Sequence, residues 1–133
     1  MMKREELYYV LFEQQKELQE EREFIDREIK DKVLSFIHLK LPIIITGVRR
    51  SGKSTLLHII KNQLKLKQKE YLYINFNDER LTSFSIEDFQ KILDFISEQD
   101  YSANCYLFLD EIQEANGWEK WIDRIREKHP IFI

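Results

Sequence analysis

A glycine-containing octapeptide in the first half of the chain has the spacing of a phosphate-binding loop. Gly47, Gly52, Lys53 and Ser54 occupy every fixed position of the pattern G-x-x-x-x-G-K-[ST]. Two of the chain's three glycines lie here, and glycine lets the backbone curl so that successive N–H groups point at phosphate oxygens. Lys53 would reach the β- and γ-phosphates, and the Ser54 hydroxyl would coordinate Mg²⁺. The alternative is an ordinary glycine turn before a helix.

Two acids follow an apolar run later in the chain. Residues 106–109 are apolar, and Asp110 and Glu111 come directly after them. A strand buried among neighbours has no place for charge in its middle, but its carboxyl end opens on the crevice where ligands bind. There Asp110 can hold Mg²⁺ through water, and Glu111 can polarise an attacking water as a general base. Alternatively, the acids cap the next segment of the chain.

The surroundings of these acids discriminate among classes of nucleotide hydrolase. A GTPase is expected to carry D-x-x-G after the third strand, but position 113 is Gln, and no [NT]-K-x-D guanine reader occurs. The chain also lacks the L-S-G-G-Q signature of transporter-type ATPases. An aspartate followed by a glutamate instead indicates an ATPase with an extra catalytic acid.

Strand-like and helix-like segments alternate after Pro42, which predicts βαβ units and a parallel sheet. The β-branched run 43–45 predicts a strand buried on both faces, and it is followed by a helix over about 53–66. Further strands are expected at 71–76, at 105–109 and from residue 130 onward. The phosphate loop therefore follows a predicted strand and opens a predicted helix, as its mechanism requires.

Two more helices connect the later strands. Ser85 is the expected N-cap of the first, with Asp88 at the capping-box position, and this helix runs through Gln99. Its predicted apolar stripe comprises Ile86, Phe89, Ile92 or Leu93, and Ile96. The second helix runs to about Lys128, and the helical spacing of Trp118, Trp121, Ile122 and Ile125 places both tryptophans in the core.

The N-terminal segment 3–40 contains no proline or glycine and is rich in helix formers. A long helix, bent or broken, is expected, with a thin apolar stripe. It is either a coiled-coil or partner-docking arm or a solvated helix that packs one edge on the domain. The second interpretation is favoured because Gln14 and Glu21 interrupt the stripe. We therefore divide the chain into a charged helical segment, 1–40, and a domain, 41–133.

Composition limits the partners and the location of the protein. The 133 residues are 43% hydrophobic and 34% charged, which is enough for one core under a charged surface. A formal net charge of −3 argues against bulk attraction to nucleic acid. The apolar runs are too short to span a bilayer and the N-terminus has no signal core, so we expect a cytoplasmic protein.

The remaining reactive side chains show no pattern of a second site. Cys105 is the only cysteine, which excludes an intrachain disulfide, and it is expected to pack in its strand. His38, His58 and His129 lack metal-ligand spacing and are expected to be structural or exposed. Basic residues beside the loop raise a nucleic-acid-binding alternative, but the net charge is against it and a solvated helix end explains the lysines more simply: Lys61, Lys65, Lys67 and Lys69. Arg49 and Arg50 could face phosphate, a partner or solvent.

Taken together, the segments 45–57, 73–81, 106–113 and 117–119 resemble the AAA-like P-loop ATPases of archaea and bacteria. The resemblance implies an α/β, three-layer P-loop NTPase-type parallel sheet of about four strands, incomplete at its C-terminal side, with the fourth strand between the first and the third. It implies that Asp110 and Ser54 coordinate Mg²⁺ and that Glu111 is the base. The ATP-binding residues would be Gly47, Val48, Arg49, Arg50, Ser51, Gly52, Lys53, Ser54 and Thr55.

The end of the chain departs from that family pattern. The sequence stops at Ile133, where the fourth strand should end, before the family's sensor residue, fifth strand and any arginine finger. We therefore expect a truncated product or fragment that binds ATP and hydrolyses it very slowly. The alternative is a hydrolysis-dead nucleotide-binding or helical interaction module. Partners are expected to be ATP and ADP, with protein contact or self-association through 1–40 or an exposed first-strand edge.

Overall fold

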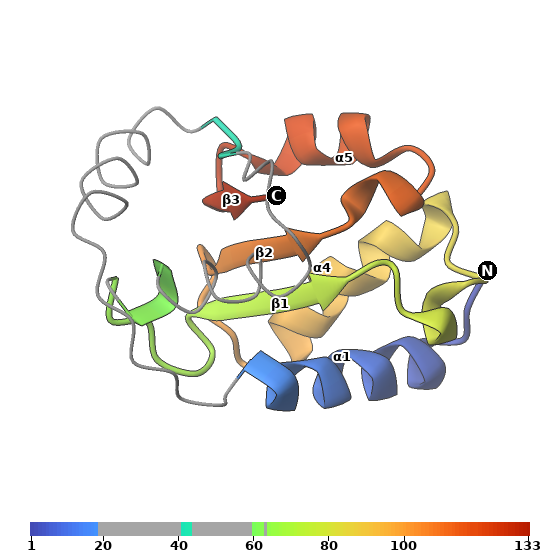
Figure 1. The fold of residues 1–133 in the computed structure, drawn as a ribbon, viewed down its shortest axis with the longest axis horizontal. Coiled ribbons are helices and arrows are strands. Elements are labelled where there is room, and N and C mark those ends of the chain that lie inside the picture. The colour runs from blue at the N-terminus through green and yellow to red at the C-terminus, as the bar shows by residue number, and fades with distance from the viewer. Residues whose placement is uncertain (19–40, 44–59, 63) are drawn as a thin grey trace.

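The computed structural model describes residues 1–18, 41–43, 60–62 and 64–133 (Figure 1). Several predicted features lie outside these residues: the phosphate loop 47–55, the greater part of the first strand with its proposed edge, the first part of the helix after the loop, and the N-terminal segment beyond residue 18. The end of that post-loop helix is described, and residues 60–62 are helical as predicted.

The described strands form a parallel sheet in the order β1-β2-β3. Their bounds are Tyr71–Asn75 for β1, Tyr106–Asp110 for β2 and Ile131–Phe132 for β3. Beyond β3, Ile43 forms a parallel bridge with Phe132 and donates its N–H to the Ile131 carbonyl at 2.8 Å. The predicted fourth strand, β3, thus lies between the predicted third strand, β2, and Ile43 of the predicted first strand. This confirms the order that the family resemblance implied.

Both faces of the sheet are buried, which explains why the strands are almost continuously apolar. One face carries Leu72, Ile74, Leu107, Leu109 and Ile131, and it packs in the main core with side chains from the helices. The other face carries Tyr71, Tyr73, Phe108 and Phe132, and it packs with Ile60 from the end of the post-loop helix. The architecture is therefore the α/β fold with a parallel sheet that the sequence predicted.

The helix after β1 begins with a tighter turn than predicted. A 3₁₀ turn, η2 (Ile86–Asp88), leads into α4 (Phe89–Glu98), and the Ser85 N–H donates to Asp88 Oδ2 at 2.9 Å, which confirms the capping box. Phe89, Ile92 and Ile96 are buried as predicted, but Ile86 is 60% exposed. Its placement on the stripe was wrong because three residues per turn, instead of 3.6, rotate Ile86 away from the buried face.

Helix α5 (Trp118–Ile125) leads back to β3 and ends three residues earlier than predicted. Trp121 is buried and stacks on Phe89 with ring centroids 4.6 Å apart, and Trp118 is partly buried against the same core. The tryptophans are therefore core residues, as their spacing predicted. The 3₁₀ turns η1 (Glu79–Leu81) and η3 (Ile112–Glu114) complete the described elements.

Helix α1 (Arg4–Leu18) runs alongside β1 (Figure 1). Leu7 and Leu11 are fully buried in the main core, and Arg4 bridges to Asp94 and Glu98 of α4. Over residues 4–18 the helix thus packs one edge on the domain, which was the favoured interpretation. Gln14, expected to interrupt the stripe, is also fully buried, for a reason given below.

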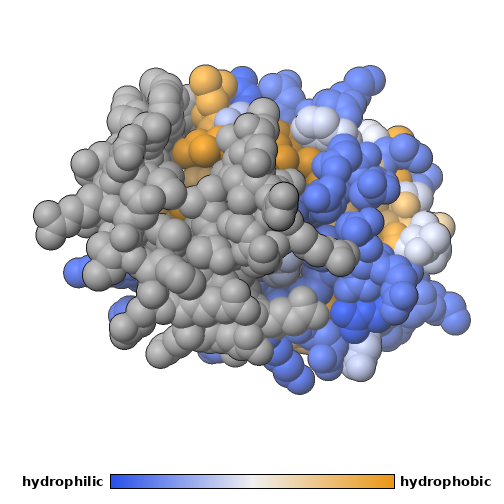
Figure 2. All heavy atoms as spheres, in the orientation of Figure 1, coloured by the Kyte–Doolittle hydropathy of each residue, from blue (hydrophilic) through white to orange (hydrophobic). Residues whose placement is uncertain are grey.

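The described surface visible in Figure 2 is mostly hydrophilic, with hydrophobic side chains in small groups. This agrees with a chain in which one residue in three is charged. None of the helices in the described part of the chain has the length and apolar character needed to cross a membrane.

Candidate functional site

Asp110 is the last residue of β2 and lies at the carboxyl edge of the sheet. Its register partner is Asn75, the last residue of β1, so two polar side chains end neighbouring strands. Alternation along β2 gives Asp110 the same face as Phe108, which is the face covered by Ile60 and the end of the post-loop helix. A half-buried carboxylate at this edge offers the hard oxygen ligand that Mg²⁺ prefers.

Glu111 follows in a backbone conformation that glutamate seldom adopts. Its φ of 54° and ψ of 42° lie in the left-handed region, directly between β2 and η3. This conformation costs roughly 1–2 kcal/mol for a residue with a Cβ, so the surrounding structure must enforce it. The Glu111 carboxylate accepts a hydrogen bond from the Gln113 side-chain amide. The chain therefore turns sharply at Glu111, directly after Asp110.

Tyr73 makes a contact to Asp110 that the sequence did not predict. Tyr73 pairs in register with Phe108, and its phenol reaches along the neighbouring strand to donate to Asp110 Oδ2 at 3.3 Å. The ring is buried on the same face as Phe108 and Ile60. Tyrosines at alternating positions in an apolar strand are usual for a sheet, so the sequence carried no signal that this phenol would meet an acid.

The outer edge of β1 is closed by two glutamine side chains of α1. The Gln15 amide donates to the Tyr73 carbonyl at 2.7 Å and accepts from the Tyr73 N–H at 2.8 Å. The Gln14 amide donates to the Asn75 carbonyl at 3.0 Å and accepts from the Asn75 N–H at 3.1 Å. These four bonds replace a neighbouring strand and satisfy the edge groups that would otherwise invite pairing with another chain. Gln14 and Gln15 are buried for this reason.

The loop after β1 is held by a charge pair. Both carboxylate oxygens of Asp78 accept hydrogen bonds from the Arg80 guanidinium, at 3.0 and 2.7 Å. One of them also accepts a hydrogen bond from the Gln14 amide at 3.1 Å. The hydrogen bond from Arg80 is the main cause that lowers the pKa of Asp78 to about 2. Asp78 therefore stays ionised at neutral pH and connects α1 to the segment that follows Asn75.

The phosphate loop is the other half of the predicted site. All loop residues from Gly47 to Thr55, including Lys53 and Ser54, lie outside the described residues. Within the described ranges, no group of three or more His, Cys, Asp or Glu side chains could hold a metal ion. Of the two predicted metal ligands, Asp110 is the one that the structure describes, and its half-buried carboxylate is an oxygen ligand of the kind that Mg²⁺ prefers.

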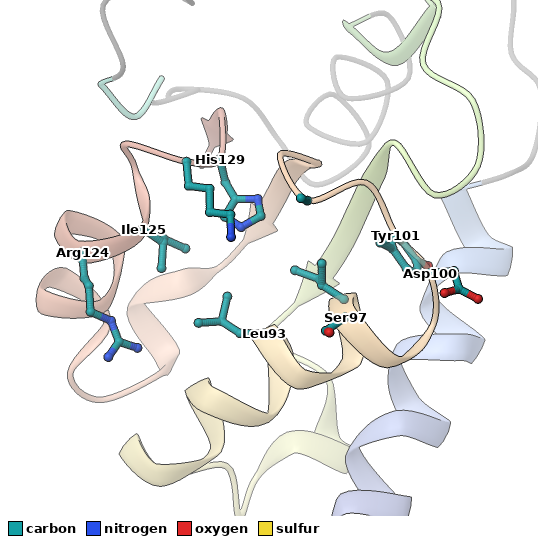
Figure 3. Close-up of a pocket in the computed structure, with 10 residues that line it drawn as sticks. Leu93, Ser97, Asp100, Tyr101, Arg124, Ile125 and His129 are labelled. Carbon is teal, nitrogen blue, oxygen red and sulfur yellow. The ribbon is translucent and has the colours of Figure 1, made fainter.

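A pocket of about 550 Å³ lies at the opposite end of the strands. Figure 3 shows Leu93, Ser97 and Tyr101 on one side of it and Arg124, Ile125 and His129 on the other. These residues belong to α4, α5 and the segments that lead into β2 and β3. Because ligands of parallel α/β sheets bind at the carboxyl ends of the strands, where Asp110 lies, this pocket is not the candidate nucleotide site.

His129 lines that pocket and contacts Cys105, and both residues are structural, as expected. Cys105 is 1% exposed, and burial raises the pKa of its thiol to about 12. His129 Nδ1 lies 2.9 Å from the Cys105 carbonyl oxygen, and burial lowers the pKa of the imidazole. A thiol held neutral in this way is not a nucleophile at physiological pH.

Comparisons with known proteins show the family to which the chain belongs. The family model described as "AAA domain" matches residues 39–133. An uncharacterized protein of Methanocaldococcus jannaschii is 34% identical over 118 residues, which cover 88% of this chain and 25% of that protein. An uncharacterized protein of Haemophilus influenzae is 35% identical over 88 residues, covering 62% and 22%. The chain thus spans about a quarter of the length of these relatives. No solved structure matches it.

Proposed function

The chain belongs to the AAA domain family, and from this premise we propose that it binds ATP with Mg²⁺ and contributes to ATP hydrolysis in the complete protein. Family membership implies nucleotide binding of the P-loop NTPase type. The observation that supports the finer proposal is Asp110, which ends the middle described strand on the face packed against Ile60. Ile60 belongs to the helix that follows the predicted phosphate loop. Phosphate and metal binding require a loop before such a helix and an acid at the strand end that faces the helix.

Each site residue has one role in the proposal. Lys53 neutralises charge on the β- and γ-phosphates, while backbone N–H groups of residues 47–55 surround the phosphate oxygens. The Ser54 hydroxyl and the Asp110 carboxylate hold Mg²⁺, which supplies charge neutralisation on the phosphates when it is bound. Glu111 orients the attacking water and accepts its proton at a carboxylate oxygen. Catalysis is then mainly positioning and electrostatic stabilisation.

The conformation of Glu111 supports a catalytic rather than a capping role. The residue departs from the strand in the left-handed region, and its carboxylate does not act as a helix cap for η3. Lys65, Lys69 and Asp100 also have a positive φ, so the support comes from the position of Glu111 directly beside the proposed metal ligand, where strained backbone is typical of active sites. In the described arrangement the carboxylate is engaged by Gln113, so we propose that Glu111 exchanges this contact for water when nucleotide is bound.

Calorimetric titration of Mg·ATP tests the binding proposal. Lys53→Ala should weaken affinity by about tenfold or more, because hydrogen bonds to charged groups contribute about 1.5–3 kcal/mol. Lys67→Ala is the matched control, since Lys67 is an exposed lysine on the turn before β1. Equal Mg·ATP affinity in the Lys53→Ala variant and the unmodified chain would refute the phosphate-loop assignment.

Hydrolysis is tested separately, by single-turnover phosphate release. Phosphate release from the unmodified chain gives the reference rate. Glu111→Gln should lower whatever release is measured while leaving ATP affinity intact, since a general base acts on the transition state. If Glu111→Gln leaves a measurable rate unchanged, Glu111 is not the general base. If the unmodified chain binds ATP but releases no phosphate, the alternative of a hydrolysis-dead binding or interaction module is favoured.

A further inference from the structure

The Tyr73 side chain on β1 contacts the carboxylate of the proposed metal ligand, Asp110, at the end of β2. Its phenol donates to Asp110 Oδ2 at 3.3 Å, from a position two register steps before the end of β1. The side chain is only 6% exposed, and its ring packs in the cluster that contains Phe108 and Ile60. A tyrosine ring fixed by packing has little freedom to carry its hydroxyl elsewhere, so the direction of this hydrogen bond is set by the fold.

The backbone of Tyr73 is fixed as firmly as its ring. On one side β1 pairs with β2, and on the other the Gln15 amide bonds both the N–H and the carbonyl of Tyr73. Gln15 is itself buried and donates also to the Leu11 carbonyl at 2.8 Å. Helix α1 is therefore connected through Gln15 and Tyr73 to the carboxylate at the end of β2.

We infer that Tyr73 is a positioning residue that orients the Asp110 carboxylate for Mg²⁺, with Gln15 of α1 holding Tyr73 in place. The inference rests on the proposed function, because it assigns Asp110 to the metal. Hydrogen bonds to a ligating carboxylate orient the ligand and tune the metal, and their loss typically weakens metal binding by 10- to 100-fold. Tyr73 touches neither substrate nor metal in this assignment, so its effect should be seen in metal affinity rather than in affinity for metal-free ATP.

The test measures Mn²⁺ binding to the ATP-saturated chain by electron paramagnetic resonance, together with ATP affinity in EDTA. Tyr73→Phe should weaken Mn²⁺ binding about tenfold and leave ATP affinity in EDTA unchanged. Tyr71→Phe is the matched control, because Tyr71 lies on the same strand and face and packs in the same cluster. It should leave both quantities unchanged.

A double-mutant cycle separates positioning from general loosening of the sheet. In an Asp110→Asn background, where the charged ligand is absent, Tyr73→Phe should produce no further loss of Mn²⁺ affinity, since directly coupled residues are non-additive. Unchanged Mn²⁺ binding in Tyr73→Phe, an equal loss in Tyr71→Phe, or full additivity with Asp110→Asn would overturn the inference. If the unmodified chain binds no ATP, the proposed function itself fails. If the unmodified chain binds ATP but Tyr73→Phe leaves the Mn²⁺ affinity unchanged, only the positioning role of Tyr73 is refuted.

Discussion

Replacing Gln15 should destabilise the fold far more than its polar character suggests. The Gln15→Leu variant keeps a side chain of similar size but removes the donor and the acceptor that pair with the Tyr73 backbone. Both backbone groups of Tyr73 then lose their hydrogen bonds to the Gln15 amide, at a strand residue that is 6% exposed. At about 1–3 kcal/mol for each buried unsatisfied group, and with some access for water at the sheet edge, the unfolding free energy should fall by about 2–4 kcal/mol.

Urea unfolding followed by far-ultraviolet circular dichroism and by tryptophan fluorescence from α5 measures this loss. Gln90→Leu is the matched control, because it makes the same change at an exposed position of α4, where Gln90 bonds only Asp94. The control should stay within about 0.5 kcal/mol of the unmodified chain. A loss of 2–4 kcal/mol is a large part of the 5–15 kcal/mol typical of a domain.

A second substitution at the same position checks the assigned geometry. Gln15→Glu retains an acceptor for the Tyr73 N–H but presents a second carboxylate oxygen to the Tyr73 carbonyl. The ionised form is disfavoured there, so the pKa of this glutamate should be raised and the deficit relative to the unmodified chain should shrink as the pH falls from 7 to 5. A Gln15→Leu loss below 0.5 kcal/mol, or a Gln15→Glu deficit that does not depend on pH, would refute the edge-closure reasoning.

Three further outcomes follow from single contacts. Burial opposes ionisation of Asp88, but hydrogen bonds from Lys91, Met2 and Ser85 outweigh it and lower the pKa of this carboxyl. Its stabilisation is therefore complete above about pH 4 and lost as the pH falls through the lower folded-state pKa, so Asp88→Asn should reduce stability at pH 7 and flatten the acid decline in urea titrations. Cys105 should react with a thiol reagent at pH 8 only after unfolding, because burial raises its pKa to about 12; rapid labelling of the native chain would contradict this. Gly117→Ala should lower stability by about 1–2 kcal/mol, because Gly117 has a φ of +82° and an added Cβ would lie 2.8 Å from Ile86 Cγ1. Adding Ile86→Ala to this variant should recover the part of the stability loss caused by the contact between the new Cβ and Ile86. The part caused by the positive φ should remain.

Much of the architecture was predictable because it follows from local pattern. Short apolar runs separated by helical periodicity require a parallel sheet with both faces covered, and the structure has one. Asp110 could be placed at a strand end because a charge cannot lie in the middle of a strand buried on both faces. The capping box at Ser85 and Asp88 was also predictable, since it depends on residues three apart.

Features that depend on distant segments were not predictable from one sequence. Gln14 interrupts an apolar stripe when the helix is considered alone, and Gln15 was not singled out by any local pattern. Only the position of α1 beside β1 gives their amides the Asn75 and Tyr73 backbones to pair with. Ile86 fitted a helical stripe until a 3₁₀ turn rotated it into solvent.

The same limit applies to the candidate site. The composition of the phosphate loop and the acid pair predicts the chemistry, because each residue type has one suitable role toward phosphate or metal. The contact between Tyr73 and Asp110 arises only when two strands 31 residues apart, from Asn75 to Tyr106, pair in a register that brings a phenol to a carboxylate. Strand register is decided by packing across the whole sheet, so that contact belongs to the tertiary structure and not to any local stretch of sequence.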